Sequence, residues 1–191
     1  VGELQGCQDG IDLYFSTFAK SMAAIGAFIA ADHDIIMYLK YNMRSQTYAK
    51  ALPMPYVVGA MKRLDLIHQH PELRDKLWEN VRALQNGLRA RGFNIGDTNS
   101  PVTPVLLQSE GGVIEATAMV RDLRETHGVF CPVVPKGVIM LRVIPTAAHS
   151  LADVDYTLNV FSEVAENLKN GLYKQIVVAN AVPEAIESAA E

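Results

Sequence analysis

The chain has 191 residues, of which 49% are hydrophobic and 20% are charged, and its formal net charge is -4 at pH 7. This composition is typical of a soluble globular protein of one or two domains, and it carries no basic footprint for nucleic acid or an anionic membrane. The two cysteines, Cys7 and Cys131, suggest neither a disulfide framework nor a metal site. No segment has the pattern of a transmembrane helix or a signal peptide. We therefore expect a cytoplasmic protein without a bound metal.

The first part of the chain contains two short apolar runs, IDLYF at 11–15 and AFIAA at 27–31. Continuous apolar runs flanked by Gly and Ser are typical of strands that are covered on both faces. Because the chain begins at VGELQG and its first recognisable element is already such a run, we expect it to start in mid-domain. Helices are predicted after Asp32 and after Pro55, and two prolines exclude a continuous helix between them.

The clearest helix begins at Pro71 and ends before Gly92, because apolar residues recur at spacings of three and four between them. Shorter elements follow it, and they predict a compact α+β unit. The expected strands are VTPVLL (102–107), GVFC (128–131) and VIMLRVI (138–144), the expected helices lie around 114–123 and after Ser150, and Asp153 completes the cap of the last one.

These patterns predict two domains and a tail. Residues 1–70 would end a larger domain, residues 71–173 would form the α+β domain with a bridging helix, and the acidic, Ala-rich residues 174–191 would be weakly held.

Lys20 stands alone in the stretch FSTFAKSMAAIGAF, between the first two expected strands. A crowded, partly desolvated pocket favours the neutral amine, which can form a Schiff base with an aldehyde cofactor. A solvated loop lysine is the alternative, and spacing alone favours it. The small residues around Lys20 are Ala19, Ala23, Ala24 and Gly26, and the hydroxyl side chains beside it are Ser16, Thr17 and Ser21.

The wider context resembles a known family. TFAKSMAAIGAFIA resembles the cofactor-lysine motif of the α-oxoamine synthase family of pyridoxal 5'-phosphate (PLP) enzymes, and PVVPKGVIMLRVIPTAAHSLADVD is similar to that family's C-terminal signature. The resemblance covers most of residues 9 to 170, with SPVTPVLL placed between the two motifs. It implies an α/β fold, the C-terminal part of a fold-type-I PLP-dependent transferase. The family's first half would then precede Val1.

The resemblance also implies roles for individual residues. Lys20 would form the Schiff base with the cofactor and later remove the substrate's α-proton, Thr17 would bond the cofactor phosphate or ring oxygen, and Arg142 would hold the substrate carboxylate. The alternatives are a turn hydroxyl for Thr17 and a surface ion pair for Arg142, whose apolar neighbours argue for burial. His149 is interpreted as structural and Lys136 as solvated.

Two segments depart from the family pattern. Ala49 or Lys50 stands where the family usually has a hydroxyl residue that reaches the partner subunit's phosphate. The connection between Gly128 and Pro132 is shorter than in the family.

The reaction implied by the resemblance is condensation of a small amino acid with an acyl-CoA thioester, giving an α-amino ketone, usually with loss of CO2. A homodimer with a shared active site is implied. A serine palmitoyltransferase-like enzyme is preferred slightly over 2-amino-3-ketobutyrate CoA ligase (glycine C-acetyltransferase), with 8-amino-7-oxononanoate synthase third. An aminotransferase of the same fold and a non-catalytic fragment remain as alternatives.

Overall fold

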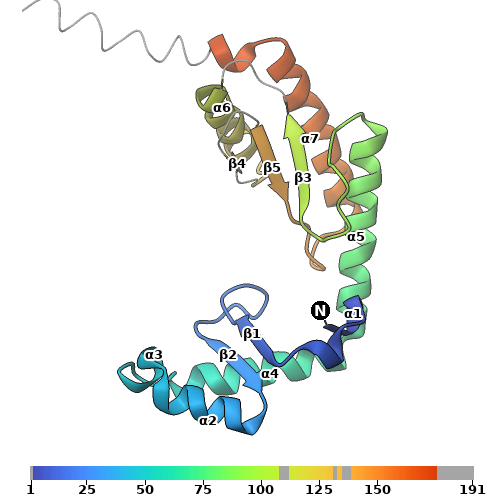
Figure 1. Ribbon diagram of the computed structural model, residues 1–191. Coiled ribbons are helices and arrows are strands. Elements are labelled where there is room, and N and C mark those ends of the chain that lie inside the picture. Colours follow the sequence, from blue (N-terminus) through green and yellow to red (C-terminus); the bar gives the residue numbers. More distant parts are fainter. Residues whose placement is uncertain (1, 108–111, 131–132, 135–138, 176–191) are drawn as a thin grey trace, which may run out of the picture. The chain divides into compact units, whose positions relative to one another are not determined.

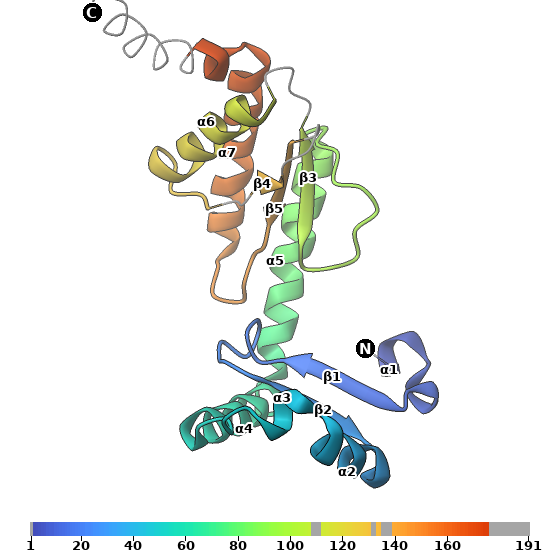
Figure 2. The same ribbon diagram turned by 60° about the vertical axis from the view of Figure 1, so that its left-hand side comes forward.

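The computed structural model describes residues 2–107, 112–130, 133–134 and 139–175. The chain divides into two compact units, Val1–Pro71 and Glu72–Glu191 (Figures 1 and 2). The sequence-based interpretations of Cys131, Lys136 and the tail from residue 176 onward fall outside the described residues.

The first unit is built from one β-hairpin and several helices. The two predicted strands are confirmed, and they pair in antiparallel register from Leu13 with Ala31 to Thr17 with Ala27. The predicted helices are confirmed as well, and a four-residue helix lies in the segment where the prolines exclude a continuous one. The elements are α1 (Gly2–Gln5), the 3-10 helix η1 (Gln8–Gly10), β1 (Leu13–Thr17), β2 (Ala27–Ala31), α2 (His33–Asn42), α3 (Arg44–Thr47) and α4 (Met54–Gln69).

The predicted burial of both faces of this hairpin is wrong for this chain. Phe15 on β1 is 66% exposed and Phe28 on β2 is 44% exposed. Among the described residues of the first unit, Ala60 is the one buried hydrophobic side chain. The apolar runs therefore predicted the strands correctly, but the described part of the chain does not supply the layers that would cover them.

The second unit is a three-stranded antiparallel sheet with helices packed on one face (Figure 2). The strand order is β3-β5-β4, and β5 pairs with β3 from Thr103 with Val143 to Leu107 with Ile139. Alternate residues of β3 and β5 join α5, α6 and α7 in one core. The elements are α5 (Pro71–Ala90), β3 (Thr103–Leu107), α6 (Gly112–Glu125), β4 (Val133–Val134), β5 (Ile139–Val143) and α7 (Leu151–Lys169).

Local interactions explain how the helices of this unit end and meet. Ser150 and Asp153 form the predicted capping box at the start of α7. A Cβ at Gly87 of α5 would overlap the Leu158 side chain, so this glycine allows α5 and α7 to approach closely. Tyr173, which follows α7 and is fully buried, donates a hydrogen bond of 2.7 Å to a carboxylate oxygen of α6.

The strand predicted at 128–131 is corrected. Gly128 has a left-handed φ of 67°, and the Val129 N–H donates to the Leu123 carbonyl at 2.7 Å. The backbone at 128–130 is therefore still closing the end of α6 and is irregular. The strand at this edge of the sheet is Val133–Val134 instead, where Val133 pairs with Leu141.

Among the described residues, no helix combines the length and the hydropathy needed to cross a bilayer.

Candidate functional site

Lys20 lies in the loop of residues 18–26 that joins β1 and β2. The Phe18 N–H donates to the Gly26 carbonyl and the Ala24 N–H donates to the Phe18 carbonyl, both at 2.9 Å. Inside the loop the Ala23 N–H donates to the Lys20 carbonyl at 2.9 Å. Backbone hydrogen bonds therefore fix both the neck of the loop and the turn that carries the lysine.

Two residues of this loop have left-handed backbone conformations. Ala23 has a φ of 44°, which is uncommon for a residue with a side chain. Gly26 has a φ of 95°, and a Cβ there would come within 2.9 Å of Leu52 Cδ1. Only glycine satisfies both the backbone conformation and this close approach, so Gly26 shapes the loop.

The surroundings of the lysine differ from the expectation. The Lys20 side chain is exposed, and no ion pair joins it to another described residue. The crowded, desolvated pocket predicted from its small neighbours is therefore not formed by the described part of this chain. The small residues around Lys20 leave its amine accessible to solvent instead of enclosing it in a pocket.

Thr17 bonds to the backbone of the same loop. Its Oγ1 donates to the Gly26 carbonyl at 3.2 Å and accepts the Ala19 N–H at 3.1 Å. A hydroxyl has one proton, so Thr17 would have to release Gly26 before it could donate to a phosphate. In this structure Thr17 is a turn hydroxyl, and its role toward a cofactor stays a prediction.

Arg142 lies on β5, opposite Pro104 of β3, in the second unit. Its neighbours Leu141 and Val143 are buried, with 0% and 8% exposure, but Arg142 itself is exposed. The predicted burial is wrong because successive side chains of a strand point to opposite faces of the sheet. Thr17 and Lys20 thus lie on one hairpin of the first unit. Arg142 belongs to the second unit, and its side chain lies on the face of the sheet that points away from that unit's core.

The turn that follows β5 is held by a buried asparagine that the sequence analysis missed. Asn80 of α5 is 0% exposed, and its Nδ2 donates to the Thr146 carbonyl at 2.9 Å and to the His149 carbonyl at 2.8 Å. Its position four residues before Leu84 puts it on the apolar stripe of α5, and a polar residue there was the available signal. The Nδ1 of His149 accepts the Thr146 N–H at 2.9 Å, which agrees with its structural interpretation.

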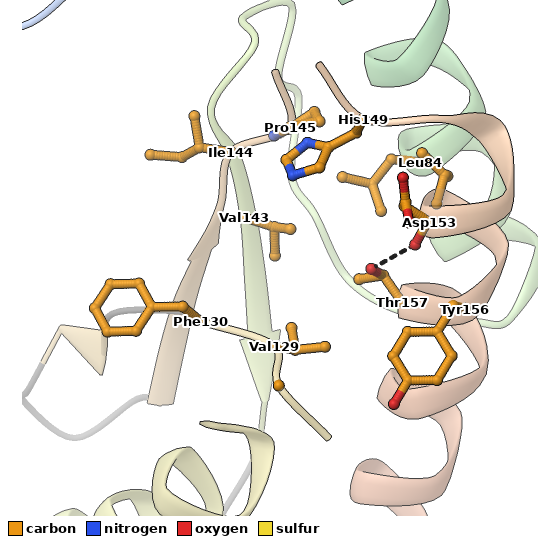
Figure 3. A pocket seen from close by; sticks show the side chains of 12 residues that line it. Leu84, Val129, Phe130, Val143, Ile144, Pro145, His149, Asp153, Tyr156 and Thr157 are labelled. Atoms are coloured by element: carbon orange, nitrogen blue, oxygen red, sulfur yellow. Dashed lines mark hydrogen bonds between the residues drawn. The ribbon is translucent and has the colours of Figure 1, made fainter. Parts of the chain in front are cut away.

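A cavity of about 330 Å³ lies beside this turn, between the start of α7, the end of β5 and the segment at 128–130 (Figure 3). Its size falls within the range of about 300–1,000 Å³ seen for small-molecule pockets. It is lined by Leu84, Gly128, Val129, Phe130, Val143, Ile144, Pro145, His149, Asp153, Val154, Tyr156 and Thr157.

Comparison with known proteins places these features in context. The family model for class I and II aminotransferases matches residues 2–161. The cysteate-C-fatty acyltransferase of Capnocytophaga ochracea is 58% identical over 181 residues, which are 92% of this chain and 43% of that protein. The serine palmitoyltransferase of Sphingobacterium spiritivorum is 32% identical over 155 residues, 78% of this chain and 38% of that protein. The chain thus spans less than half the length of these curated relatives.

Solved structures give the same picture. The structure of Sphingomonas wittichii serine palmitoyltransferase superposes with a TM-score of 0.79 at 26% identity, covering 88% of this chain and 43% of that one. A high-resolution structure of SPT with a PLP internal aldimine gives the same TM-score at 27% identity and the same coverage.

Proposed function

Because the chain belongs to the family of class I and II aminotransferases, we propose that it forms the C-terminal part of a PLP-dependent acyltransferase that condenses an amino acid with a fatty acyl-CoA thioester. The observation that carries this proposal is the 58% identity, over 92% of the chain, with a cysteate-C-fatty acyltransferase. The fold class and the family predicted from the sequence are both confirmed by the matches to serine palmitoyltransferases.

The amino acid proposed is cysteate, because the chain is 58% identical to the cysteate-C-fatty acyltransferase of Capnocytophaga ochracea and 32% identical to the serine palmitoyltransferase of Sphingobacterium spiritivorum. This changes the order favoured by the sequence, in which a serine palmitoyltransferase-like enzyme came first. In the proposed reaction the amino acid α-carbon bonds to the thioester carbonyl carbon. The C–S bond breaks and the CoA thiol leaves, while the amino acid carboxyl group is lost as CO2.

The residues of the hairpin loop fit a PLP cofactor. Lys20 presents an exposed primary amine on a loop whose neck is closed by backbone hydrogen bonds, and a primary amine is the group that binds an aldehyde. PLP, when bound, supplies an electron sink for negative charge at the substrate α-carbon. Lys20 would hold the cofactor and its Nζ would then accept the α-proton, and Thr17 would contact the cofactor once its bond to Gly26 is released.

Arg142 is proposed to orient the substrate through a forked pair with its carboxylate. Its exposure on β5 supports this role, because no ion pair with another described residue occupies the guanidinium.

A homodimer with a shared active site is proposed. In it the segment from Tyr48 to Pro55, which includes Lys50, would face the partner subunit. The exposed side chains of Tyr48, Met54 and Tyr56 in and beside that segment support a covering surface there.

Borohydride reduction of the enzyme that contains this chain, with PLP present, tests the proposal. Reduction makes the link between an amine and the cofactor permanent, so peptide mass mapping should find the added mass on Lys20. Lys20→Ala should remove this label, and Lys62→Ala, which removes an exposed lysine of α4, should not.

Label spread evenly over many lysines, or label retained after Lys20→Ala, would contradict the assignment. Release of CoA thiol when palmitoyl-CoA is added with cysteate separates the acyltransferase from an aminotransferase, which exchanges amino groups with a keto acid and needs no thioester. Failure to label any residue would favour the non-catalytic fragment.

A further inference from the structure

We propose that the cavity beside the start of α7 binds the hydrocarbon chain of the acyl thioester substrate (Figure 3). The cavity is formed wholly by residues of the second unit. The identity of the ligand rests on the proposed function, but the shape and chemistry of the cavity do not. Its volume of about 330 Å³ suits a chain of several carbons rather than a single small ion.

Three apolar side chains form part of the inner wall of the cavity. Leu84, Val143 and Val154 come from α5, β5 and α7, and each is less than a tenth exposed. Two further apolar residues of the lining, Phe130 and Ile144, are exposed, and their side chains extend to the side of β5 away from Val143 (Figure 3). The apolar part of the wall is stabilised when a hydrocarbon displaces water from it.

The polar side chains that line the cavity are already bonded within the protein. The hydroxyl of Tyr156 donates to the His127 carbonyl at 3.0 Å, and the hydroxyl of Thr157 donates to the Asp153 carbonyl at 2.8 Å (Figure 3). Asp153 Oδ2 accepts the N–H and the O–H of Ser150, both at 2.7 Å. A polar ligand would find few free donors here, whereas a hydrocarbon chain requires none.

His149 supplies one donor suited to the thioester end of the ligand. Because its Nδ1 accepts the Thr146 N–H, the neutral ring carries its proton on Nε2. That N–H has no hydrogen-bond partner among the described residues and can donate to a thioester carbonyl. The Asp153 carboxylate beside the cavity repels an anionic head group, so the geometry favours an acyl thioester over a free fatty acid.

The turn that carries His149 is fixed before any ligand binds. The two donor bonds from buried Asn80 reach the carbonyls at both ends of the turn, Thr146 and His149. A preformed wall lowers the entropic cost of binding.

The test uses the full chain and neutral S-acyl-N-acetylcysteamine thioesters with four to ten acyl carbons, with dissociation constants measured by calorimetry. The dissociation constant should fall about fourfold for each added carbon until the cavity is filled, which corresponds to about 0.8 kcal/mol for each buried methylene. A dissociation constant that does not depend on chain length would overturn the proposal.

Two variants locate the binding. Thr157→Phe places a ring in the cavity and should weaken binding of the ten-carbon probe at least about tenfold. Thr47→Phe is the matched control, since Thr47 is exposed, lies outside the cavity and makes the same kind of hydrogen bond to the carbonyl four residues earlier.

Equal effects of Thr157→Phe and Thr47→Phe on the dissociation constant would show that the probes adsorb to other apolar surface and would overturn the site. The probes contain no amino acid and need no cofactor, so their binding is measured apart from the chemistry of Lys20. If the dissociation constant depends on chain length but Lys20 is not labelled, the proposed function is overturned and the apolar site is kept. If Lys20 is labelled but the dissociation constant does not depend on chain length, only the apolar site is overturned.

Discussion

Asn80 shows how one buried polar side chain organises a connection between two elements. Both N–H groups of its carboxamide are used by the turn between β5 and α7, and its Oδ1 has no hydrogen-bond partner in the described part of the chain. A hydrogen bond within a protein contributes about 0.5–1.5 kcal/mol to stability. The carboxamide is therefore retained at a position where the pattern of α5 calls for an apolar residue.

Asn80→Leu should lower the free energy of unfolding by about 1–3 kcal/mol, because it removes the two hydrogen bonds to the Thr146 and His149 carbonyls. Urea denaturation followed by circular dichroism measures this change. Asn86→Leu makes the same substitution at an exposed position of the same helix and should change stability by less than about 0.5 kcal/mol. Equal effects of the two variants would show that the hydrogen bonds of Asn80 contribute nothing.

The start of α7 is an element whose boundary is determined by local chemistry. Ser150 Oγ accepts the Asp153 N–H at 3.2 Å, and Asp153 Oδ2 accepts the Ser150 N–H at 2.7 Å. The hydrogen bonds from the backbone and then the side chain of Ser150 lower the pKa of Asp153. A carboxyl group whose pKa is lowered by folding stabilises the folded state above its ordinary pKa, and this contribution is lost as the pH falls through the lowered value.

Ser150→Ala should destabilise the protein by about 0.5–2 kcal/mol near neutral pH through loss of the helix cap. The difference between Ser150→Ala and the unchanged chain should shrink as the pH falls below the ordinary aspartate pKa of about 4 and through the lowered pKa of Asp153. Thermal unfolding across a pH series measures both effects. Ser162→Ala, in the middle of the same helix, is the control, and a pH-independent loss in Ser150→Ala would contradict the role of the carboxylate.

The whole molecule consists of two units with very different interiors. The core of the second unit joins three helices and two strands, and it is continuous. In the described residues of the first unit, by contrast, Ala60 is the one buried hydrophobic side chain, and the hairpin leaves Phe15 and Phe28 exposed. Because burial of apolar surface is the main stabilising contribution to folding, the two units should differ in local stability.

Hydrogen exchange followed by mass spectrometry should show this difference. The amides of β3 and β5 should exchange at least about 100-fold more slowly than those of β1 and β2. The comparison is matched, because each pair of strands is antiparallel with five residue pairs in register. Equal protection in the two sheets would show that the first unit is stable despite its exposed apolar side chains.

The site could be predicted from the sequence only where its residues are local. The motif around Lys20 indicates a loop between two strands, and the loop is there, with Thr17 at the end of the strand before it. The burial of Arg142 was predicted wrongly, since apolar neighbours on a strand lie on the opposite face. Asn80 was missed because its partners lie 66 and 69 residues away along the chain.

By itself the sequence determined the type and order of most elements, the cap of α7 and the family resemblance, because these depend on spacings within one segment. Tertiary structure alone decided which faces of the hairpin are covered, where the edge strand beside β5 lies and which residues enclose the cavity at α7. Those features depend on contacts between residues far apart in the chain, and a local pattern carries no information about which distant surface will meet it.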